Sequence, residues 1–266
     1  MMPTFPLLLL IGSLLFSTSS SAETNNQDRL VRIQQTSLLR VCIWPDYYSI
    51  TYRNPKTQTL SGIDIEMAQQ LASDLGVELE FVDSSFSKLV DDVTSDRCDI
   101  AMFGVGVTAS RQKSLRFSSP HLVSDIYAIS SKTNRRVQDW SNIDQAGTIV
   151  AVAKGTLHEP VMKNKLKQAE LLILDSPFAR EQEVQSGRAD VFMTDYPYSQ
   201  RFLVSADWAR LIAPPSEYHS TPYAYAMQPG DDRWHARVEQ FVSDVKKDGR
   251  LLRAARRYQL DPIIAK

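Results

Sequence analysis

One eight-residue pattern occurs twice in this chain, first at residues 95–102 and again at residues 186–193. Both copies read Ser-x-Arg-x-Asp-apolar-x-Met. In each copy a helical pattern ends at the serine and an apolar run begins after the aspartate, which is typical of a helix that leads into a buried strand. The repetition therefore predicts two similar units, whose corresponding strand ends carry different charged groups.

The residues before each copy continue this symmetry, because short apolar runs alternate with helical periodicity. In the first unit we expect strands at 39–44, 79–82 and 99–103 and helices at 62–75 and 86–94. In the second unit we expect strands at 148–152, 171–174 and 191–194 and helices at 159–168 and 178–185. This alternation predicts two α/β units, each with a mostly parallel sheet flanked by helices.

Two extended segments, 126–129 and 221–227, are placed to carry the chain from one unit to the other and back. We therefore expect an α/β protein of two lobes joined by two hinge crossings. The first lobe would comprise residues 30–124 and 222–266, and the second lobe residues 125–221. A ligand cleft between such lobes lies at the carboxyl ends of their strands.

The N-terminus contains an apolar run at residues 5–16 that is too short to span a bilayer. Ser20-Ser21-Ala22 follows and forms a small-residue cleavage pattern. We therefore expect a signal peptide over residues 1–22, cleaved near Ala22, and a protein exported to the periplasm. The chain departs from the usual signal peptide because no Lys or Arg precedes the apolar run. The alternative interpretation of this run is a buried N-terminal helix. No later stretch is apolar enough to predict stable membrane insertion.

Charge and motifs exclude several classes of function. The chain has 30 Lys+Arg against 31 Asp+Glu, which gives no basic footprint for nucleic acid. The four histidines share no metal-ligand spacing, and no Gly-x-Ser-x-Gly nucleophile motif occurs. The Gly104-Val105-Gly106 turn lacks the third glycine of a dinucleotide fingerprint. We therefore expect no metal, no cofactor and no catalytic residue.

The two cysteines, Cys42 and Cys98, lie in or beside predicted neighbouring strands. Export permits a disulfide between them. Two buried free thiols are at least as compatible with the sequence, so the pairing stays open.

The end of the first repeated unit could bind an anion. Gly104 and Gly106 would let a ligand approach the backbone closely. Thr108 is placed to cap a short helix, and Arg111 could add a planar fork for a carboxylate. A surface arginine after an ordinary turn is the alternative.

The end of the second unit carries a negative charge at Asp195, which suits an ammonium group; an ordinary helix N-cap is the alternative. Thr156 opens the first helix of this unit and offers another helix N-terminus for a carboxylate. Tyr47 and Phe86 follow strands of the first unit and could form aromatic walls, although core packing explains them almost as well. Together these residues predict a site for a small zwitterion between the lobes.

The chain resembles the periplasmic polar-amino-acid-binding proteins that serve ABC transporters, over about residues 35–260. The resemblance rests on a set of short motifs in a fixed order: Leu39-Arg40-Val41, Gly62-Ile63-Asp64-Ile65-Glu66-Met67-Ala68, Asp99-Ile100-Ala101-Met102, Thr108-x-x-Arg111, Phe117-Ser118-x-Pro120, Gly155-Thr156 and Thr194-Asp195. It implies the two-lobed type II binding-protein fold and an ABC permease as a partner. It also implies that Arg111 takes the ligand carboxylate and Asp195 its amino group.

The sequence also resembles a branch of secreted enzymes, the periplasmic cyclohexadienyl (arogenate/prephenate) dehydratases. In that branch a glutamate just after Thr-Asp is the general acid, and here Tyr198 stands at that place. A phenol with a pKa near ~10 is a poor acid for this task. Two further departures from the binding proteins, Phe103 and Leu157, would make the pocket drier. Tyr198 and Phe103 are thus expected to line it.

We therefore expect a non-enzymatic, exported protein that closes around an amino acid or a related small organic acid for ABC-type uptake. The first alternative is a lyase that acts on arogenate or prephenate. The second is a stand-alone sensory or accessory binding protein.

Overall fold

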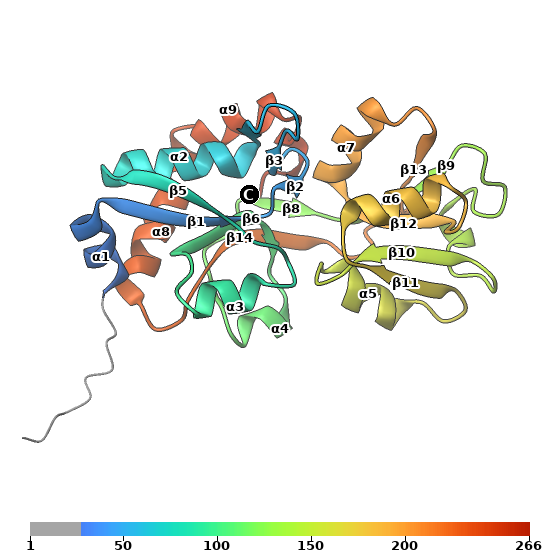
Figure 1. The fold of residues 1–266 in the computed structure, drawn as a ribbon, viewed down its shortest axis with the longest axis horizontal. Helices are drawn as coiled ribbons and strands as arrows, with labels where there is room; N and C mark the ends of the chain where they lie inside the picture. Colours follow the sequence, from blue (N-terminus) through green and yellow to red (C-terminus); the bar gives the residue numbers. More distant parts are fainter. Residues whose placement is uncertain (1–27) are drawn as a thin grey trace, which may run out of the picture.

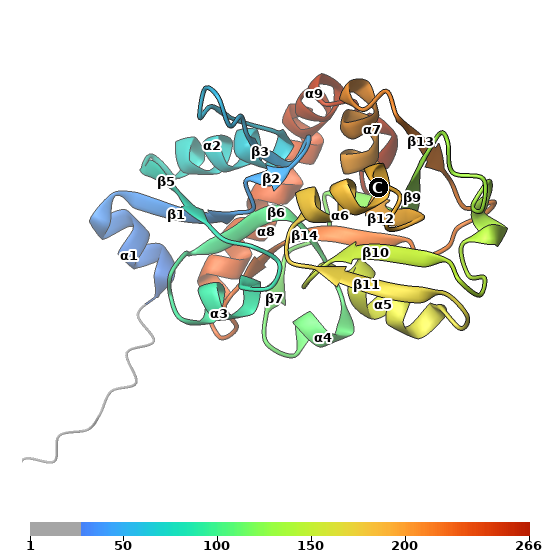
Figure 2. The ribbon, with the colours of Figure 1, turned by 45° about the vertical axis from the view of Figure 1, so that its right-hand side comes forward.

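The computed structural model describes residues 28–266, so the predicted signal peptide lies outside the described residues. Two α/β units lie side by side and are joined by the two chain segments that follow β8 and precede β14 (Figure 1, Figure 2). We call the six-stranded sheet with its helices the first lobe, and the five-stranded sheet with its helices the second lobe. The predicted two-lobed α/β class is confirmed.

The first lobe has the strand order β5-β1-β6-β14-β7, with β8 paired to β14. Its parallel strands are β1 (Leu38–Ile43), β5 (Glu78–Asp83) and β6 (Ile100–Gly106). Its antiparallel strands are β7 (Arg116–Phe117), β8 (Leu122–Ser124) and β14 (Thr221–Met227). A small sheet of β2 (Asp46–Tyr47), β3 (Thr51–Arg53) and β4 (Leu60–Ser61) lies beside it. The helices are α1 (Arg29–Thr36), α2 (Ile63–Leu75), α3 (Leu89–Thr94), α4 (Ala109–Gln112), α8 (Asp232–Lys247), α9 (Arg250–Arg257) and the 3₁₀ turn η2 (Asp261–Ile263).

The second lobe repeats the parallel core in the order β11-β10-β12 and adds β9 and β13 antiparallel to it. Its strands are β9 (Ile126–Ser131), β10 (Ile149–Ala153), β11 (Glu170–Leu174), β12 (Val191–Asp195) and β13 (Ala209–Ile212). Its helices are α5 (His158–Lys165), α6 (Pro177–Gln185), α7 (Tyr196–Ser205) and the 3₁₀ turn η1 (Trp140–Asn142). Both sheets are therefore mixed, with three parallel strands at the core of each.

The repeated octets build the same junction in both lobes. The Asp99 backbone N–H donates to the Arg40 carbonyl, and the Asp99 side chain accepts from the Arg40 N–H at 2.8 Å. Asp190 bonds Ile149 in the same way, and its side chain accepts from the Ile149 N–H at 2.9 Å. Each aspartate thus fixes the start of its own strand to the neighbouring parallel strand.

The other octet positions match too. Arg97 pairs with Asp92 and Arg188 with Glu183, in each case five residues back on the preceding helix. Every residue of β6 and β12 is buried, because elements cover both faces of these central strands. The octets therefore place the ends of β6 and β12 at equivalent central positions.

The chain crosses between the sheets at Asp125 and again over residues 213–220. The Asp125 carboxylate ties the two crossings together, because it accepts from the Ile126 N–H at 2.6 Å, the Tyr218 N–H at 2.8 Å and the His219 N–H at 2.7 Å. The segments predicted as crossings, 126–129 and 221–227, extend into the sheets as β9 and β14. The exact lobe bounds stay a prediction.

Cys42 in β1 and Cys98 just before β6 form a disulfide, with a Cα–Cα distance of 5.6 Å. The sequence left this pairing open, and the pairing of β1 with β6 decides it by bringing the two cysteines together. Both side chains are fully buried.

Most predicted elements agree with the structure to within two residues, although α3 begins only at Leu89. The helix α7 and the strand β13 were not predicted. Within residues 28–266, no helix has the length and apolar character needed to cross a membrane.

Candidate functional site

A buried cavity lies between the two sheets, at the carboxyl ends of their central strands; we call it the interlobe cavity. Its volume is about 20 Å³, so anything larger than a water molecule enters only when the lobes move apart. The first lobe contributes Trp44, Tyr47, Phe86, Gly104 and Tyr223, and the second lobe contributes Thr156, Leu157, His158, Arg180, Thr194, Asp195 and Tyr198. Both lobes thus supply its walls.

Asp195 ends β12 and holds the two lobes together through its carboxylate. Its Oδ2 accepts hydrogen bonds from the phenol groups of Tyr47 and Tyr223, the second at 2.6 Å. Its Oδ1 accepts from the Tyr198 N–H at 3.1 Å and so caps α7. Burial raises the pKa of Asp195. Asp195 is therefore a helix N-cap, and the same side chain lines the interlobe cavity.

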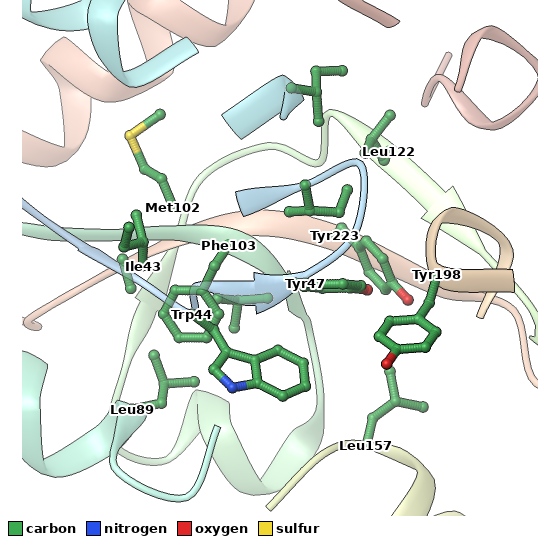
Figure 3. Packing of buried hydrophobic residues seen from close by; sticks show 14 of the residues in the cluster. Ile43, Trp44, Tyr47, Leu89, Met102, Phe103, Leu122, Leu157, Tyr198 and Tyr223 are labelled. Atoms are coloured by element: carbon green, nitrogen blue, oxygen red, sulfur yellow. The ribbon is translucent and has the colours of Figure 1, made fainter. Parts of the chain in front are cut away.

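Figure 3 shows Tyr47 and Tyr223 of the first lobe pointing their hydroxyl groups toward the second lobe, where Tyr198 and Leu157 face them. Burial raises the pKa of both Tyr47 and Tyr223 well above its ordinary value. Both phenols are therefore protonated at neutral pH and act as hydrogen-bond donors to Asp195.

Arg111 lies beside the interlobe cavity and does not line it. Thr108 caps the short helix α4 by accepting from the Arg111 N–H at 3.3 Å. The guanidinium donates to the carbonyl of Gly106 at 2.9 Å and to the carbonyl of Gly155, in the second lobe, at 3.1 Å. It lies 5.2 Å from the centre of the Phe86 ring. Burial lowers the pKa of Arg111 to about 10, so it stays charged at neutral pH.

Two glycines permit close packing at the cavity, one within the first lobe and one between the lobes. Gly104 adopts φ +61°, and a Cβ there would lie 2.9 Å from the Tyr47 ring of the same lobe. Its N–H donates to the buried Asp64 carboxylate of α2 at 2.7 Å, which fixes this part of β6. Gly155 adopts φ +75°, and a Cβ there would lie 2.5 Å from the backbone nitrogen of Ser87 in the other lobe. Both positions therefore require glycine.

Residues 39–261 match the bacterial extracellular solute-binding proteins, family 3. The chain belongs to this family. The predicted family resemblance is thus confirmed over almost the whole described part of the solute-binding protein.

The relatives of this solute-binding protein include both binding proteins and an enzyme. It is 32% identical to a cyclohexadienyl dehydratase of Pseudomonas aeruginosa, over 90% of this chain and 88% of that one. It is 26% identical to the L-cystine-binding protein TcyJ of Escherichia coli K12, over 72% of this chain and 71% of that one.

Solved structures show the same fold. An ancestral amino acid-binding protein described as a precursor of cyclohexadienyl dehydratase has a TM-score of 0.80 at 26% identity, covering 86% of this chain and 98% of that one. An amino acid ABC transporter substrate-binding protein of Streptococcus pneumoniae, bound to L-arginine, has a TM-score of 0.79 at 25% identity, covering 89% of this chain and all of that one.

The structure brings most of the predicted site residues of this solute-binding protein to the interlobe cavity. Those that line it are Tyr47, Phe86, Gly104, Thr156, Asp195 and Tyr198. Those that do not line it are Phe103, Gly106, Thr108 and Arg111. Phe103 is fully buried and packs against Phe86 at a centroid distance of 5.0 Å, because its β6 side chain points into the core. Leu157, predicted to dry the pocket, lines it.

Five lining residues were not predicted: Trp44, His158, Arg180, Thr194 and Tyr223. The sequence placed His158 beside Glu159 at a helix start and gave neither a role. In the structure Glu159 accepts from the Gly155 N–H, whereas His158 is buried. Burial and the nearby Arg180 charge lower the pKa of His158 to about 3, so it is neutral. Nothing in the helical pattern of residues 178–185 marked Arg180 as a cavity residue.

Among residues 28–266, no group of His, Cys, Asp and Glu side chains is arranged to hold a metal ion. The arrangement is a small cavity with aromatic walls, the buried Asp195 carboxylate and the buried Arg180 guanidinium, with the Arg111 guanidinium beside it. Once the lobes move apart, these groups can hold a small charged organic molecule by hydrogen bonds from both lobes.

Proposed function

We propose that this protein is exported to the periplasm, with residues 1–22 removed near Ala22, and closes its lobes around an amino acid or a related small organic acid for ABC-type uptake. Membership of the solute-binding family supports this proposal. Relatives named for cystine binding and a structural neighbour bound to arginine support the ligand class.

The observation that carries the proposal is the hydrogen-bond bridge between the lobes at Asp195. The hydrogen bonds from Tyr47 and Tyr223 to the Asp195 carboxylate cross between the lobes, so they form only when the lobes are closed. A ligand that enters while the lobes are apart would place its ammonium at Asp195 in place of the phenol donors, and its carboxylate would take the guanidinium donors that Arg111 now gives to the backbone. Ligand binding and lobe closure are then one event.

A calorimetric screen of amino acids and small organic acids tests this function. We expect a dissociation constant of ~1 μM or tighter for at least one compound. Arg111→Ala should weaken that affinity at least tenfold, whereas Arg116→Ala, which removes an exposed arginine of the same lobe, should leave it unchanged. Equal affinity of the Arg111→Ala and wild-type proteins would overturn the assignment of Arg111.

A lyase function is the second candidate, and one observation favours it. The Glu181 carboxyl, carried by α6, accepts a hydrogen bond from the Tyr198 hydroxyl, at the place where the sequence lacks a glutamate. Burial raises the pKa of Glu181, which makes it a better proton donor near neutral pH. The dehydratase relative adds to this candidate.

Incubation with prephenate, followed by ultraviolet detection of phenylpyruvate, separates the two candidates. We expect binding without turnover. Turnover that disappears in Glu181→Gln would establish the lyase instead, and Glu183→Gln serves as the control because Glu183 pairs with Arg188 on the surface.

A further inference from the structure

Arg180 is a buried cation inside the interlobe cavity that no motif predicted. It lies on α6 with only 2% of its surface exposed. Its guanidinium carbon lies 4.9 Å from the centre of the Phe192 ring and 4.6 Å from that of Tyr198. Its Nη1 donates to the Met193 carbonyl at 2.7 Å. These contacts hold the guanidinium plane in a fixed orientation at the cavity wall.

The remaining edge of this guanidinium has no protein partner. Within residues 28–266, Arg180 Nε makes no hydrogen bond, and Nη1 is the only guanidinium nitrogen of Arg180 that donates. No carboxylate of the described chain lies within 4.0 Å of Arg180, whereas the buried Arg29 is paired with Asp99 at 3.0 Å. A buried charge without a counter-ion is unfavourable, so this one is expected to have a function.

Two cations and two carboxyl groups lie at or beside the cavity, but neither cation is directly paired. Arg111 and Arg180 are both buried, and in the described chain neither has a carboxylate partner within ion-pair distance. His158 lies near both arginines and is neutral. The carboxyl group of Asp195 accepts three hydrogen bonds from other groups, and that of Glu181 accepts one from Tyr198. Each guanidinium is therefore open to an anionic group of a ligand.

We propose that Arg180 binds a second anionic group of the ligand, through the Nε–Nη2 edge of its guanidinium. This edge presents two parallel donors, the geometry that holds a carboxylate in a bidentate pair. The ligand class is then a small dicarboxylic acid or an amino acid with an acidic side chain. This inference rests on the proposed binding function and assigns Arg180 the role of a specificity-determining residue.

Paired ligands of equal size test the inference by calorimetry: glutamate against glutamine, and aspartate against asparagine. The wild-type protein should bind at least one acid tenfold or more tighter than its amide. In Arg180→Gln the acid and the amide should differ by less than threefold, while the affinity for the amide stays within threefold of wild type. Arg188→Gln is the matched control, because Arg188 is an exposed arginine just after the same helix.

Thermal unfolding without ligand supplies a readout that a purely structural Arg180 would not give. Arg180→Met keeps the apolar contact with the two rings and removes the unpaired charge, so its Tm should equal or exceed that of wild type. A lower Tm, or an acid preference that survives Arg180→Gln, would overturn the inference.

Failure of the inference and failure of the proposed function are distinguishable. If the wild-type protein binds neutral amino acids as tightly as acidic ones, the second anion site is refuted and the binding function stands. If it binds no amino acid or organic acid at all, the binding function is refuted and the inference with it.

Discussion

The regions around the two octets have the same backbone arrangement but differ in the side chains that surround it. In both copies an aspartate joins two parallel strands, and an arginine returns to the preceding helix. The first copy adds a disulfide and a cluster of three arginines around Asp99. The second has Ala189 in place of the cysteine, and within the described residues 28–266 Arg136 is the only ionic partner of Asp190. The contacts common to both octets position the central strands. The contacts found in only one octet stabilise the first lobe, and the residues after the octets provide the charged groups between the lobes.

The largest effect should come from the aspartates themselves. Asp99→Ala leaves three arginines without their buried partner and should lower the free energy of unfolding by about 3–5 kcal/mol. Asp190→Ala removes a more weakly paired group and should cost about 1–3 kcal/mol. Urea denaturation of both variants measures the difference, and equal losses would break the comparison by showing that the arginine cluster adds nothing.

The disulfide comes next, because only the first copy has it. Replacing both Cys42 and Cys98 by alanine should lower the free energy of unfolding by about 2–4 kcal/mol, since the bridge closes a long loop in the unfolded chain. Adding a reductant should destabilise the wild-type protein and leave the double variant unchanged. If the fully reduced wild-type protein has the same free energy of unfolding as the oxidised protein, the prediction is wrong.

Gly155 differs from Gly187, another glycine of the second lobe, because it contacts the first lobe. Gly155→Ala should weaken ligand affinity at least tenfold, about 1.4 kcal/mol, because its Cβ would meet the Phe86–Ser87 backbone before the lobes close. Gly187→Ala is the matched control: it has a similar positive φ of +76°, but no atom lies within 4 Å of its Cβ position. Its affinity should be unchanged. Small-angle scattering with ligand should show a larger radius of gyration for Gly155→Ala only.

The smallest effect concerns the pH dependence at the end of the second copy. Burial raises the pKa of Asp195, so the folded protein holds this proton more tightly than the unfolded chain does. The contribution of Asp195 to the free energy of unfolding is therefore greatest below its unfolded pKa and falls as pH rises through the raised value. Urea denaturation of wild type and Asp195→Asn across about pH 3–6 should show the difference between them changing in that direction. A difference that is constant with pH would contradict it.

Much of the fold follows from local patterns. Most parallel strands were predicted from short apolar runs and β5 from the alternation of Leu79-Glu80-Phe81-Val82, and the helices between them because their apolar residues recur at helical spacing. The helix α7 was foreseen only as the alternative in which Asp195 caps a helix, and that alternative agrees with the structure because proline is well accepted in the first turn of a helix. The strand β9 was predicted only as an extended crossing, because its antiparallel partners β12 and β13 lie far away in sequence.

The site was predicted in part for the same reason. Gly104, Thr156 and Asp195 lie at strand ends or helix starts, where local motifs mark them. Tyr223 and Arg180 reach the cavity only because β14 and α6 pack where they do, and neither residue lies in a motif.

The sequence by itself determined that two similar α/β units exist, where their central strands begin and which charged groups follow them. These are local properties of periodicity, capping and apolar runs. The tertiary structure decided the partners of each charge: the disulfide, the phenols on Asp195, the backbone carbonyls on Arg111 and the open edge of Arg180. A side chain's counter-ion depends on which distant segments pack against it, and no spacing along the chain records that.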